Sequence, residues 1–306
     1  MVLNFPPKRI ICLTEETVET LYLLGEEKRI VGVTGYAVRP KRVRLEKQRV
    51  GSFISVNIEK IKKLKPELIL TFSDVQANLT KQLILEGFNV ICFNQKSISE
   101  IFSMIKYLGS LVGNIEGAID LVIKLENQIN LIKKKNTKLK PKVYFEEWDD
   151  PYISAIGWVS EIIDIAGGVD IFAERSKAHK SKVRSVSSNE VICKNPDIIF
   201  ASWCGKKVNF KKIKEREGWD SINAIKTNFL FEIKSPIIGT AYLAPEPGGK
   251  KFVEIGKKIK KGDTVMIVEA MKTMNHVPST KDGIVKKIVV EDGQPVEYGQ
   301  TLVILE

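Results

Sequence analysis

Histidine is nearly absent from this sequence, which has only His179 and His276 among 306 residues. Two isolated imidazoles exclude a His-rich metal site and a His-based catalytic triad. The four cysteines, at positions 12, 92, 193 and 204, form no CxxC pair. The chain also lacks a Walker-type phosphate loop and a GxGxxG turn, so it has no motif for nucleotide phosphates.

Long apolar runs are missing as well. No stretch of 18 apolar residues occurs, so we expect no transmembrane segment. The start, MVLNFPPKRIICL, has charge but no adequate apolar region followed by a small-residue cleavage site. Cys12 and Cys92 lie in apolar runs and are predicted to be small buried hydrophobic residues, as in a reducing compartment. We therefore expect a cytoplasmic chain, which would be periplasmic only if a signal peptide had been removed.

Positive charge is in excess, but unevenly. The net charge is +11, and residues 235–306 hold 10 Lys and 9 acidic residues, which leaves 38 basic and 28 acidic residues, or +10, in residues 1–234. The densest run, RPKRVRLEKQR at 39–49, has little aromatic interleaving and no RNA-binding signature. Since charge runs are usually solvated faces, we expect no nucleic-acid partner.

Strand-like and helical segments alternate through the first 234 residues. Short apolar runs such as RIICL, RIVGVT, ELILTF, NVICFN, KVYFEEW and DIIFASW are separated by amphipathic stretches. The alternation predicts two α/β lobes with parallel sheets, at residues 1–112 and 142–234. Apolar residues at helical spacing between residues 114 and 135 predict a linking helix within residues 113–141.

The last 72 residues contain an internal repeat. Residues 253–269 and 290–306 share Val, Glu, Gly, Gly, Thr and Glu at a constant offset of 37. Residues 235–239 match residues 279–283 at an offset of 44, so the first half holds seven extra residues, which we place at 245–251 (PEPGGKK). Glycine turns between short strands predict a small all-β flattened barrel over residues 235–306.

Lys272 lies in the stretch EAMKTMN, which connects the two halves of this repeat. The stretch resembles the biotinylation site of biotin carboxyl carrier domains, and the seven extra residues resemble the "thumb" of the acetyl-CoA carboxylase carrier. Lipoyl domains share the fold but normally have Asp before the lysine, where this chain has Met271. The alternative is that Lys272 is one more solvated lysine in a lysine-rich chain.

The carrier resemblance implies a cofactor, partners and a pathway. Lys272 would carry covalent biotin, and Met271 and Met274 would offer soft apolar contacts to the enzymes that recognise the turn. Those partners would be biotin protein ligase, biotin carboxylase and carboxyltransferase. The implied role is to shuttle carboxybiotin in acetyl-CoA carboxylation for fatty acid synthesis, as a non-catalytic subunit.

The first part of the chain resembles another family. RIICLTEETVETLYLLGEEKRIVGVTGYAVRP at 9–40, NIEKIKKLKPELILTF at 57–72, YFEEWDDPYISAIGWVSEIIDIAGG at 144–168 and PDIIFASWCGKK at 196–207 carry the resemblance. They are similar to the helical-backbone substrate-binding proteins of ABC importers, in the cobalamin-binding branch. The resemblance covers residues 8–236 and implies a two-lobed α/β domain that binds cobalamin or a similar metal chelate.

In such proteins, aromatic residues at the ends of strands stack on a flat ligand between the lobes. The matching positions here are Tyr36, Phe53, Phe72, Trp158 and Trp203. An ordinary core role is an equally good interpretation of each single aromatic, because buried aromatic side chains are common.

Several acidic residues also have candidate roles. Glu59 and Glu232 match positions by which the family docks onto an ABC permease, although exposed glutamates more often have no such role. The cluster at 146, 147, 149 and 150 cannot converge on one site from a single strand, because adjacent side chains point to opposite faces. We interpret it as a loop at the edge of the ligand cleft, with one carboxylate available to a ligand.

The two resemblances meet at Ser235 and Pro236. The binding domain should continue there into a final helix, and no Gly/Ser-rich or Ala/Pro-rich linker separates it from the carrier. One hypothesis is therefore a recombined or artificial fusion, in which a ligand-binding receptor defines the biology and the carrier tail is incidental. An enzyme acting on a bound corrinoid is a third, weaker alternative, since no nucleophile and base pair is evident.

Overall fold

The structure is a computed structural model of the full chain. The residues that it describes are 5–134, 139–178, 180–203, 207–232, 239–244, 251–270, 273–279, 282–290, 292, 294–296 and 302–306. Among these residues, no helix is both long and apolar enough to cross a membrane.

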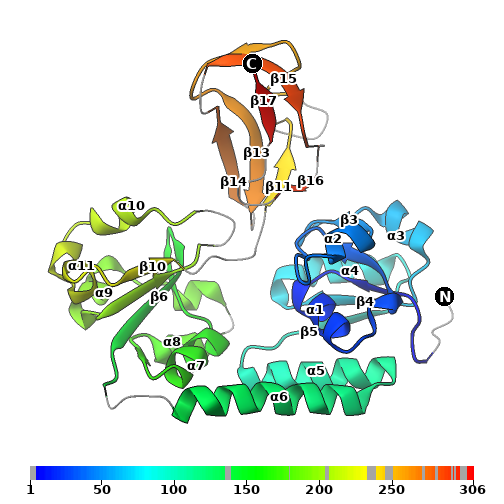
Figure 1. The fold of residues 1–306 in the computed structure, drawn as a ribbon, viewed down its shortest axis with the longest axis horizontal. Helices are drawn as coiled ribbons and strands as arrows, with labels where there is room; N and C mark the ends of the chain where they lie inside the picture. The colour runs from blue at the N-terminus through cyan, green and yellow to red at the C-terminus, as the bar shows by residue number, and fades with distance from the viewer. Residues whose placement is uncertain are drawn as a thin grey trace. The chain divides into compact units, whose positions relative to one another are not determined.

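The first lobe, coloured blue to cyan in Figure 1, is built on a parallel five-stranded sheet with the order β3-β2-β1-β4-β5. Its strands are β1 (Ile10–Cys12), β2 (Ile30–Thr34), β3 (Arg49–Gly51), β4 (Leu68–Phe72) and β5 (Val90–Phe93). Helices connect consecutive strands, as parallel pairing requires. They are α1 (Glu15–Leu23), η1 (Glu27–Arg29), α2 (Val43–Glu46), α3 (Ile58–Leu64), η2 (Asp74–Gln76) and α4 (Ala77–Leu85).

Both faces of this sheet are covered. Ile11 and Leu13 pack with Ile61 of α3 and Leu83 of α4 in one cluster. Because successive side chains on a strand alternate, Cys12 points to the other face, where it is fully buried. The central strands are therefore apolar throughout, as in doubly covered parallel sheets.

The prediction for Cys92 was wrong. Cys12 is buried, but Cys92 is exposed on β5. The physical reason is its position in the sheet, because β5 is an edge strand and its side chains are covered less completely than those of the central β1. An apolar neighbourhood in the sequence does not distinguish an edge strand from a central one.

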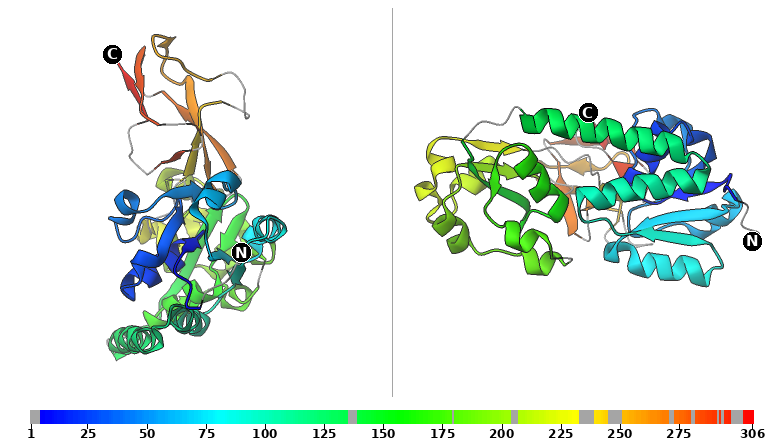
Figure 2. Two further views of the ribbon diagram at one scale, coloured as in Figure 1. Left: turned by 90° about the vertical axis from the view of Figure 1, so that its right-hand side faces the viewer. Right: turned by 90° about the horizontal axis from the view of Figure 1, so that it is seen from below.

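Two helices precede the second lobe. α5 (Ile98–Val112) and α6 (Ile115–Lys134) lie side by side (Figure 2). α5 ends at Gly113, whose φ of 76° is the left-handed conformation that favours glycine. Gly109 makes the close approach possible, since a Cβ there would lie 2.3 Å from the Ala118 Cβ. The linking helix predicted within residues 113–141 corresponds to α6, and the predicted domain bounds stay predictions.

The second lobe has a mixed sheet with the order β10-β9-β6-β7, and β8 also pairs with β6. The parallel strands are β6 (Lys142–Asp149), β8 (Val169–Asp170), β9 (Ile198–Ala201) and β10 (Leu230–Glu232). β7 (Tyr152–Ser154) is antiparallel to β6, which alternation of strands and helices does not predict. The helices are α7 (Gly157–Ile165), α8 (Ala173–Ser176), η3 (Ser181–Arg184), α9 (Ser188–Lys194), α10 (Phe210–Lys214), η4 (Trp219–Ser221) and α11 (Asn223–Lys226).

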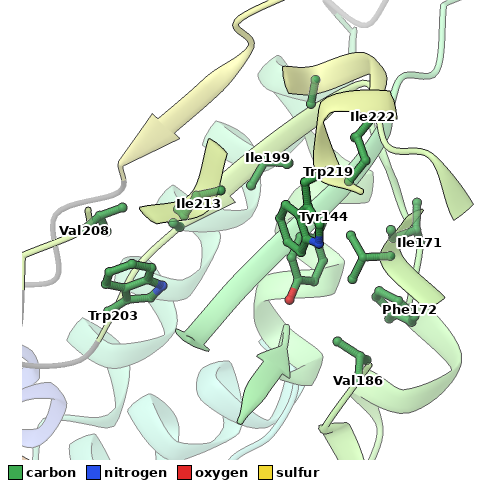
Figure 3. Packing of buried hydrophobic residues seen from close by; sticks show 13 residues of the cluster. Tyr144, Ile171, Phe172, Val186, Ile199, Trp203, Val208, Ile213, Trp219 and Ile222 are labelled. Carbon is green, nitrogen blue, oxygen red and sulfur yellow. The ribbon is translucent and has the colours of Figure 1, made fainter. Parts of the chain in front are cut away.

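Alternation along β6 divides the core of the second lobe into two clusters. Val143 and Phe145 pack with Val159 and Ile163 of α7 on one face. Tyr144 packs on the other face, where its ring lies edge-on to Trp219 at 6.2 Å between centroids (Figure 3).

The C-terminal part is all β, as predicted. Its strands are β11 (Gly239–Tyr242), β12 (Lys258–Ile259), β13 (Thr264–Ala270), β14 (Thr273–Pro278), β15 (Gly283–Ile288), β16 (Gln294–Val296) and β17 (Val303–Leu305). They form two sheets, β14-β13-β11-β16 and β12-β15-β17, around one apolar cluster. Each sheet takes strands from both halves of the repeat, so the halves interlock.

The repeat found in the sequence is present in the structure. At the offset of 37, β12 corresponds to β16 and β13 to β17, and at the offset of 44, β11 corresponds to β15. The matched apolar residues are buried alike. Val253 and Val290 are 2% and 4% exposed, and Ile259 and Val296 are also 2% and 4% exposed. Equivalent side chains therefore fill equivalent places in the core.

Candidate functional site

The hairpin of β13 and β14 presents the candidate carrier site. The two strands pair antiparallel, and the pairs run through Glu269–Met274 to Ala270–Thr273. β13 also pairs with β11, so the hairpin is held in a four-stranded sheet rather than standing alone. Three or more strands with an apolar face give a hairpin a stability that it lacks in isolation.

Two sequence positions separate the last pair of this hairpin, and the second of them is Lys272. Met271 and Lys272 lie outside the described residues, and so does the side chain of Met274. The described strands fit a covalently attached biotin in one respect, because two paired strands lead directly to the lysine that would bear it. The roles of Lys272, Met271 and Met274 stay predictions.

The extra segment of the first half has its two ends held together. The Phe252 N–H donates a 2.9 Å hydrogen bond to the Leu243 carbonyl. Eight residues, 244–251, separate this pair, whereas one residue separates the equivalent positions 287 and 289 in the second half. The difference of seven is the length of the predicted insertion. Residues 245–250 themselves lie outside the described residues.

The first lobe places three predicted aromatic residues at one edge of its sheet. Tyr36 follows β2, Phe53 follows β3 and Phe72 ends β4. All five strands are parallel, so their carboxyl ends share this edge, which is where open α/β sheets bind ligands. The ring of Tyr36 lies edge-on to that of Phe53, with centroids 6.2 Å apart. Tyr36 is buried, whereas Phe53 and Phe72 are partly exposed.

Phe53 lies in a tight turn, residues 51–56, which we call the Phe53 turn. The Ser52 N–H donates to the Ser55 carbonyl at 2.7 Å, and the two serine hydroxyls are 2.8 Å apart. Gly51 is required there, because a Cβ would lie 2.3 Å from the Ser55 carbonyl oxygen and 2.5 Å from the Val56 Cα. The turn therefore fixes the backbone that carries Phe53.

The second lobe holds its two predicted aromatic residues differently. Trp158, in the first turn of α7, is 36% exposed, whereas Trp203, just after β9, is 3% exposed. Trp203 belongs to the same core cluster as Val208 and Ile213 (Figure 3). Its indole N–H donates a 2.9 Å hydrogen bond to Glu146. This is the environment of a core residue, so a ligand contact by Trp203 stays a prediction.

Glu146 is the centre of a buried ion pair. Its carboxylate, 0% exposed, accepts two hydrogen bonds from the Arg216 guanidinium, at 2.6 and 3.0 Å, and one from the Tyr144 hydroxyl at 3.2 Å. The guanidinium lies over the rings of Tyr152 and Trp219, 4.2 and 4.4 Å from their centroids. Burial opposes the charge on Arg216, but the bonds to Glu146 outweigh it and raise the pKa of Arg216.

The interpretation of the acidic cluster as a loop was wrong for three of its four residues, whereas Asp150 does lie in the turn after β6. Glu146 and Glu147 belong to β6, which ends at Asp149. Glu147 pairs with Arg184 at 2.5 Å, and Asp149 with Lys212 at 2.9 Å. The basic partners lie far away in the sequence, so sequence patterns gave no signal for them. In the described part of the chain, no group of three His, Cys, Asp or Glu could hold a metal ion.

The two candidate docking glutamates are described to different extents. Glu59 is in the first turn of α3, with its side chain 76% exposed and 3.4 Å from the Lys62 ammonium. Glu232 ends β10, where it pairs with Ala201, but its side chain lies outside the described residues. A docking role stays a prediction for both.

Comparison with known proteins supports the two-part organisation. The family model described as "Periplasmic binding protein" matches residues 10–237. The chain is 28% identical over 243 residues to an ABC transporter substrate-binding lipoprotein of Bacillus subtilis, covering 76% of this chain and 74% of that protein. It is 30% identical over 203 residues to a vitamin B12-binding protein of Vibrio cholerae, covering 65% and 71%.

A solved structure has the same two-lobed fold. It is a possible iron-binding, periplasmic solute-binding protein from Staphylococcus epidermidis, with a TM-score of 0.64, 27% identity, and coverage of 74% of this chain and 90% of that one. The chain belongs to the periplasmic binding protein family.

The C-terminal part matches a second family model, described as "Biotin-requiring enzyme", over residues 231–305. It is 46% identical over 74 residues to the biotin carboxyl carrier protein of acetyl-CoA carboxylase from Haemophilus influenzae. The match covers 24% of this chain and 48% of that protein, so the chain spans about half the length of this carrier relative. The protein is thus a substrate-binding domain of the periplasmic binding type fused to a biotin/lipoyl carrier domain. Both are families of non-catalytic domains.

Proposed function

We propose that this protein is a biotin carboxyl carrier, with biotin attached to Lys272. The observation that carries the proposal is the β13–β14 hairpin, paired up to Ala270 and Thr273, which leads to the sequence EAMKTMN. The 46% identity to an acetyl-CoA carboxylase carrier supports biotin as the group attached. The role requires ATP, biotin ligase and acetyl-CoA in one compartment, so the proposal places the chain in the cytoplasm.

Biotin would supply a ureido nitrogen that accepts a carboxyl group at one enzyme and releases it at another. The chain's own contribution is to join the lysine to two paired strands, whose backbones have little conformational freedom left to lose on binding. We therefore propose biotin protein ligase, biotin carboxylase and carboxyltransferase as partners. Acetyl-CoA would be the final acceptor, because the seven-residue insertion has the length and position expected of that carrier type.

Intact mass spectrometry tests the attachment. After incubation with biotin ligase, ATP and biotin, the wild-type chain should gain the mass of one biotin amide. Lys272→Arg should gain none, whereas Lys258→Arg, an exposed lysine on β12 of the same domain, should gain as much as the wild type. An unmodified wild type, or equal modification of Lys272→Arg, would exclude the carrier proposal.

We propose a second function for residues 10–237, the binding of a flat metal chelate of the cobalamin or haem type. The specific support is the placement of Tyr36, Phe53 and Phe72 at the carboxyl edge of one parallel sheet. Aromatic faces at such an edge suit a flat conjugated ligand. The likeness to a vitamin B12-binding protein of Vibrio cholerae makes cobalamin the first candidate.

Absorbance titration with cyanocobalamin, and separately with hemin, tests this function. One of the two should saturate, and Phe53→Ala and Phe72→Ala should each weaken its binding by about tenfold. Tyr107→Ala removes an exposed aromatic ring on α5 and should leave the affinity unchanged. No saturable change with either ligand would exclude the chelate class.

In the alternative role, a receptor outside the cytoplasm in which the carrier domain is incidental, the same domain would deliver its ligand to an ABC permease. Glu59 suits docking, because it is 76% exposed on α3. Glu59→Arg should leave ligand affinity unchanged while abolishing stimulation of ATP hydrolysis by the permease in lipid vesicles. Unchanged stimulation would exclude Glu59 as a docking residue.

A further inference from the structure

One buried side chain connects three strand ends of the first lobe. Gln76 is 0% exposed, and its amide nitrogen donates hydrogen bonds to the Leu13 carbonyl at 3.0 Å and the Phe53 carbonyl at 2.5 Å. Its amide oxygen accepts a hydrogen bond from the Phe72 N–H at 2.8 Å. Leu13 follows β1, Phe53 follows β3 and Phe72 ends β4.

This arrangement requires a primary amide. Two backbone carbonyls need donors and one backbone N–H needs an acceptor, and a primary amide provides two donors and an acceptor oxygen. An ionised glutamate of the same length has no donor, and a lysine has no acceptor. Backbone groups in buried loops need such partners, because they have no neighbouring strand to satisfy them.

The chain positions Gln76 through a constrained turn directly after β4. Ser73 has a φ of 54° and a ψ of −178°, a backbone conformation that residues other than glycine rarely adopt. Its N–H donates to the Phe93 carbonyl at 2.7 Å, and its hydroxyl accepts from the Val75 N–H at 3.3 Å. The Gln76 N–H in turn donates to the Ser73 carbonyl at 3.3 Å. These hydrogen bonds fix the backbone of Gln76, so its side chain is held next to the ends of β1, β3 and β4.

The contacts of Gln76 bear directly on the candidate ligand surface. It holds the backbone of Phe53 and of Phe72, and the Phe53 ring contacts the ring of Tyr36. One amide thus sets the spacing between aromatic residues from different strand ends. Rigid placement of such groups before binding lowers the entropy lost when a ligand binds.

We propose that Gln76 is a positioning residue, which fixes Phe53 and Phe72 in the arrangement that receives the flat face of a metal chelate. The inference rests on the proposed ligand-binding function, but the clamp itself can be measured without ligand. Gln76 would touch the backbone of the aromatic residues and not the ligand.

Hydrogen exchange followed by mass spectrometry tests the clamp in the full-length chain. In Gln76→Leu, amides of the Phe53 turn and of residues 72 and 73 should exchange about tenfold faster, while Ile69 and Leu70 of β4 keep wild-type rates. Thr80→Val is the matched control, because it removes one side-chain hydrogen bond, of 2.9 Å to Thr71, from the adjacent helix α4. It should leave both segments at wild-type rates.

Gln76→Glu separates the two halves of the clamp. The carboxylate still accepts from the Phe72 N–H, so that amide should stay protected, but it cannot donate to the Phe53 carbonyl. Protection of the Phe53 turn should therefore fall at pH 8 and recover in part near pH 5, as a protonated carboxyl supplies one donor. If Gln76→Glu acted only by lowering the stability of the whole lobe, the protection of the Phe72 amide and of the Phe53 turn would fall together.

Affinity for whichever of cyanocobalamin and hemin binds the wild type completes the test. Gln76→Leu should lose about tenfold, and Gln76→Glu should regain affinity as the pH falls. Wild-type exchange rates in Gln76→Leu, uniform loosening of the lobe, or unchanged affinity beside faster exchange would each overturn the proposal. If neither ligand binds the wild type, the proposed function fails, and the exchange pattern alone decides whether Gln76 is a clamp.

Discussion

The two α/β lobes build the carboxyl ends of their strands with different chemistry. In the first lobe, neutral hydrogen bonds of Gln76 and of the Phe53 turn hold the loops together. In the second lobe, the same task falls to ion pairs of Glu146 with Arg216 and of Glu147 with Arg184. Similar topology therefore does not imply a similar edge. We call the edge of the first lobe the neutral edge and that of the second lobe the charged edge. Loss of one hydrogen-bonding group from the neutral edge should lower stability moderately, whereas loss of one ion from the charged edge leaves its buried partner unpaired.

The largest effect should come from breaking the charged edge. Arg216→Met leaves the carboxylate of Glu146 buried without its cation, which should lower the free energy of unfolding of the second lobe by about 3–5 kcal/mol. All four tryptophans, at 148, 158, 203 and 219, lie in this lobe, so tryptophan fluorescence during urea denaturation reports on it alone.

The double variant Glu146→Leu with Arg216→Met is the control for that prediction. Replacing both charges with apolar side chains removes the unpaired buried ion, so part of the lost stability should return, although the Trp203 indole N–H and the Tyr144 hydroxyl lose their acceptor. If the double variant is no more stable than Arg216→Met alone, the buried unpaired charge is not the cause of the loss, and the contrast between the two edges is wrong.

The stability of the neutral edge should depend on the close backbone packing of the Phe53 turn rather than on a pair of charges. Gly51→Ala brings a methyl group against the backbone of Ser55 and Val56, which cannot move as freely as a side chain. We expect a loss of about 2–3 kcal/mol in the stability of the first lobe, measured by hydrogen exchange of β1 and β4. The tryptophan-detected transition of the second lobe should not move, and a loss under about 0.5 kcal/mol would show that the turn is not constrained.

The first lobe also has one carboxylic acid at its edge that burial keeps neutral. Burial raises the pKa of Glu15 from its ordinary value of 4.5 to about 8. Between these values the folded state keeps a proton that the unfolded state has lost, so stability falls as the pH rises from about 4.5 to about 8.

Glu15→Gln should remove that dependence. The variant should be more stable than the wild type by about 1–2 kcal/mol at pH 8 and equal to it near pH 4, by hydrogen exchange of the first lobe. If Glu15→Gln is less stable than the wild type at pH 8, the ionised carboxylate of Glu15 stabilises the folded lobe. The edge of the first lobe would then contain a charge and would not be neutral.

The smallest loss of stability should come from removing a helix cap, and it should be equal in both lobes. Asn57 caps α3 by accepting from the Lys60 N–H at 2.9 Å, and Asn209 caps α10 by accepting from the Lys212 N–H at 3.0 Å. Asn57→Ala and Asn209→Ala should each cost about 1 kcal/mol in their own lobe, by the same two readouts. Unequal losses would mean that the lobes differ in more than their edges.

Local patterns in the sequence predicted most of the fold. The linking helix expected within residues 113–141 is α6, and the repeat at offsets 37 and 44 predicted the strand equivalences of the carrier domain. β3 was not predicted, because it has only three residues, which begin at the end of the basic run 39–49 and show no clear alternation. β7 was missed because its pairing with β6 runs against the parallel pattern.

The sites were predicted less completely, for a physical reason. The family resemblance, rather than a local pattern, selected Tyr36, Phe53 and Phe72. The strand before Tyr36 and the strand that ends at Phe72 can be read from the apolar runs RIVGVT and ELILTF, whereas the strand before Phe53 was not predicted. The pair of Glu146 and Arg216 spans 70 positions, and the bond from Gln76 to Leu13 spans 63. Such contacts depend on how distant segments fold together, and no local spacing encodes them.

Transfer of a labelled carboxyl group tests the central claim most directly. Biotinylated full-length protein is incubated with biotin carboxylase, ATP and labelled bicarbonate, then with carboxyltransferase and acetyl-CoA. We predict that label reaches malonyl-CoA with the wild type and with Lys258→Arg, and not with Lys272→Arg. Label that stays on the protein, or that reaches malonyl-CoA equally with Lys272→Arg, would contradict the assignment of this chain as an acetyl-CoA carboxylase carrier.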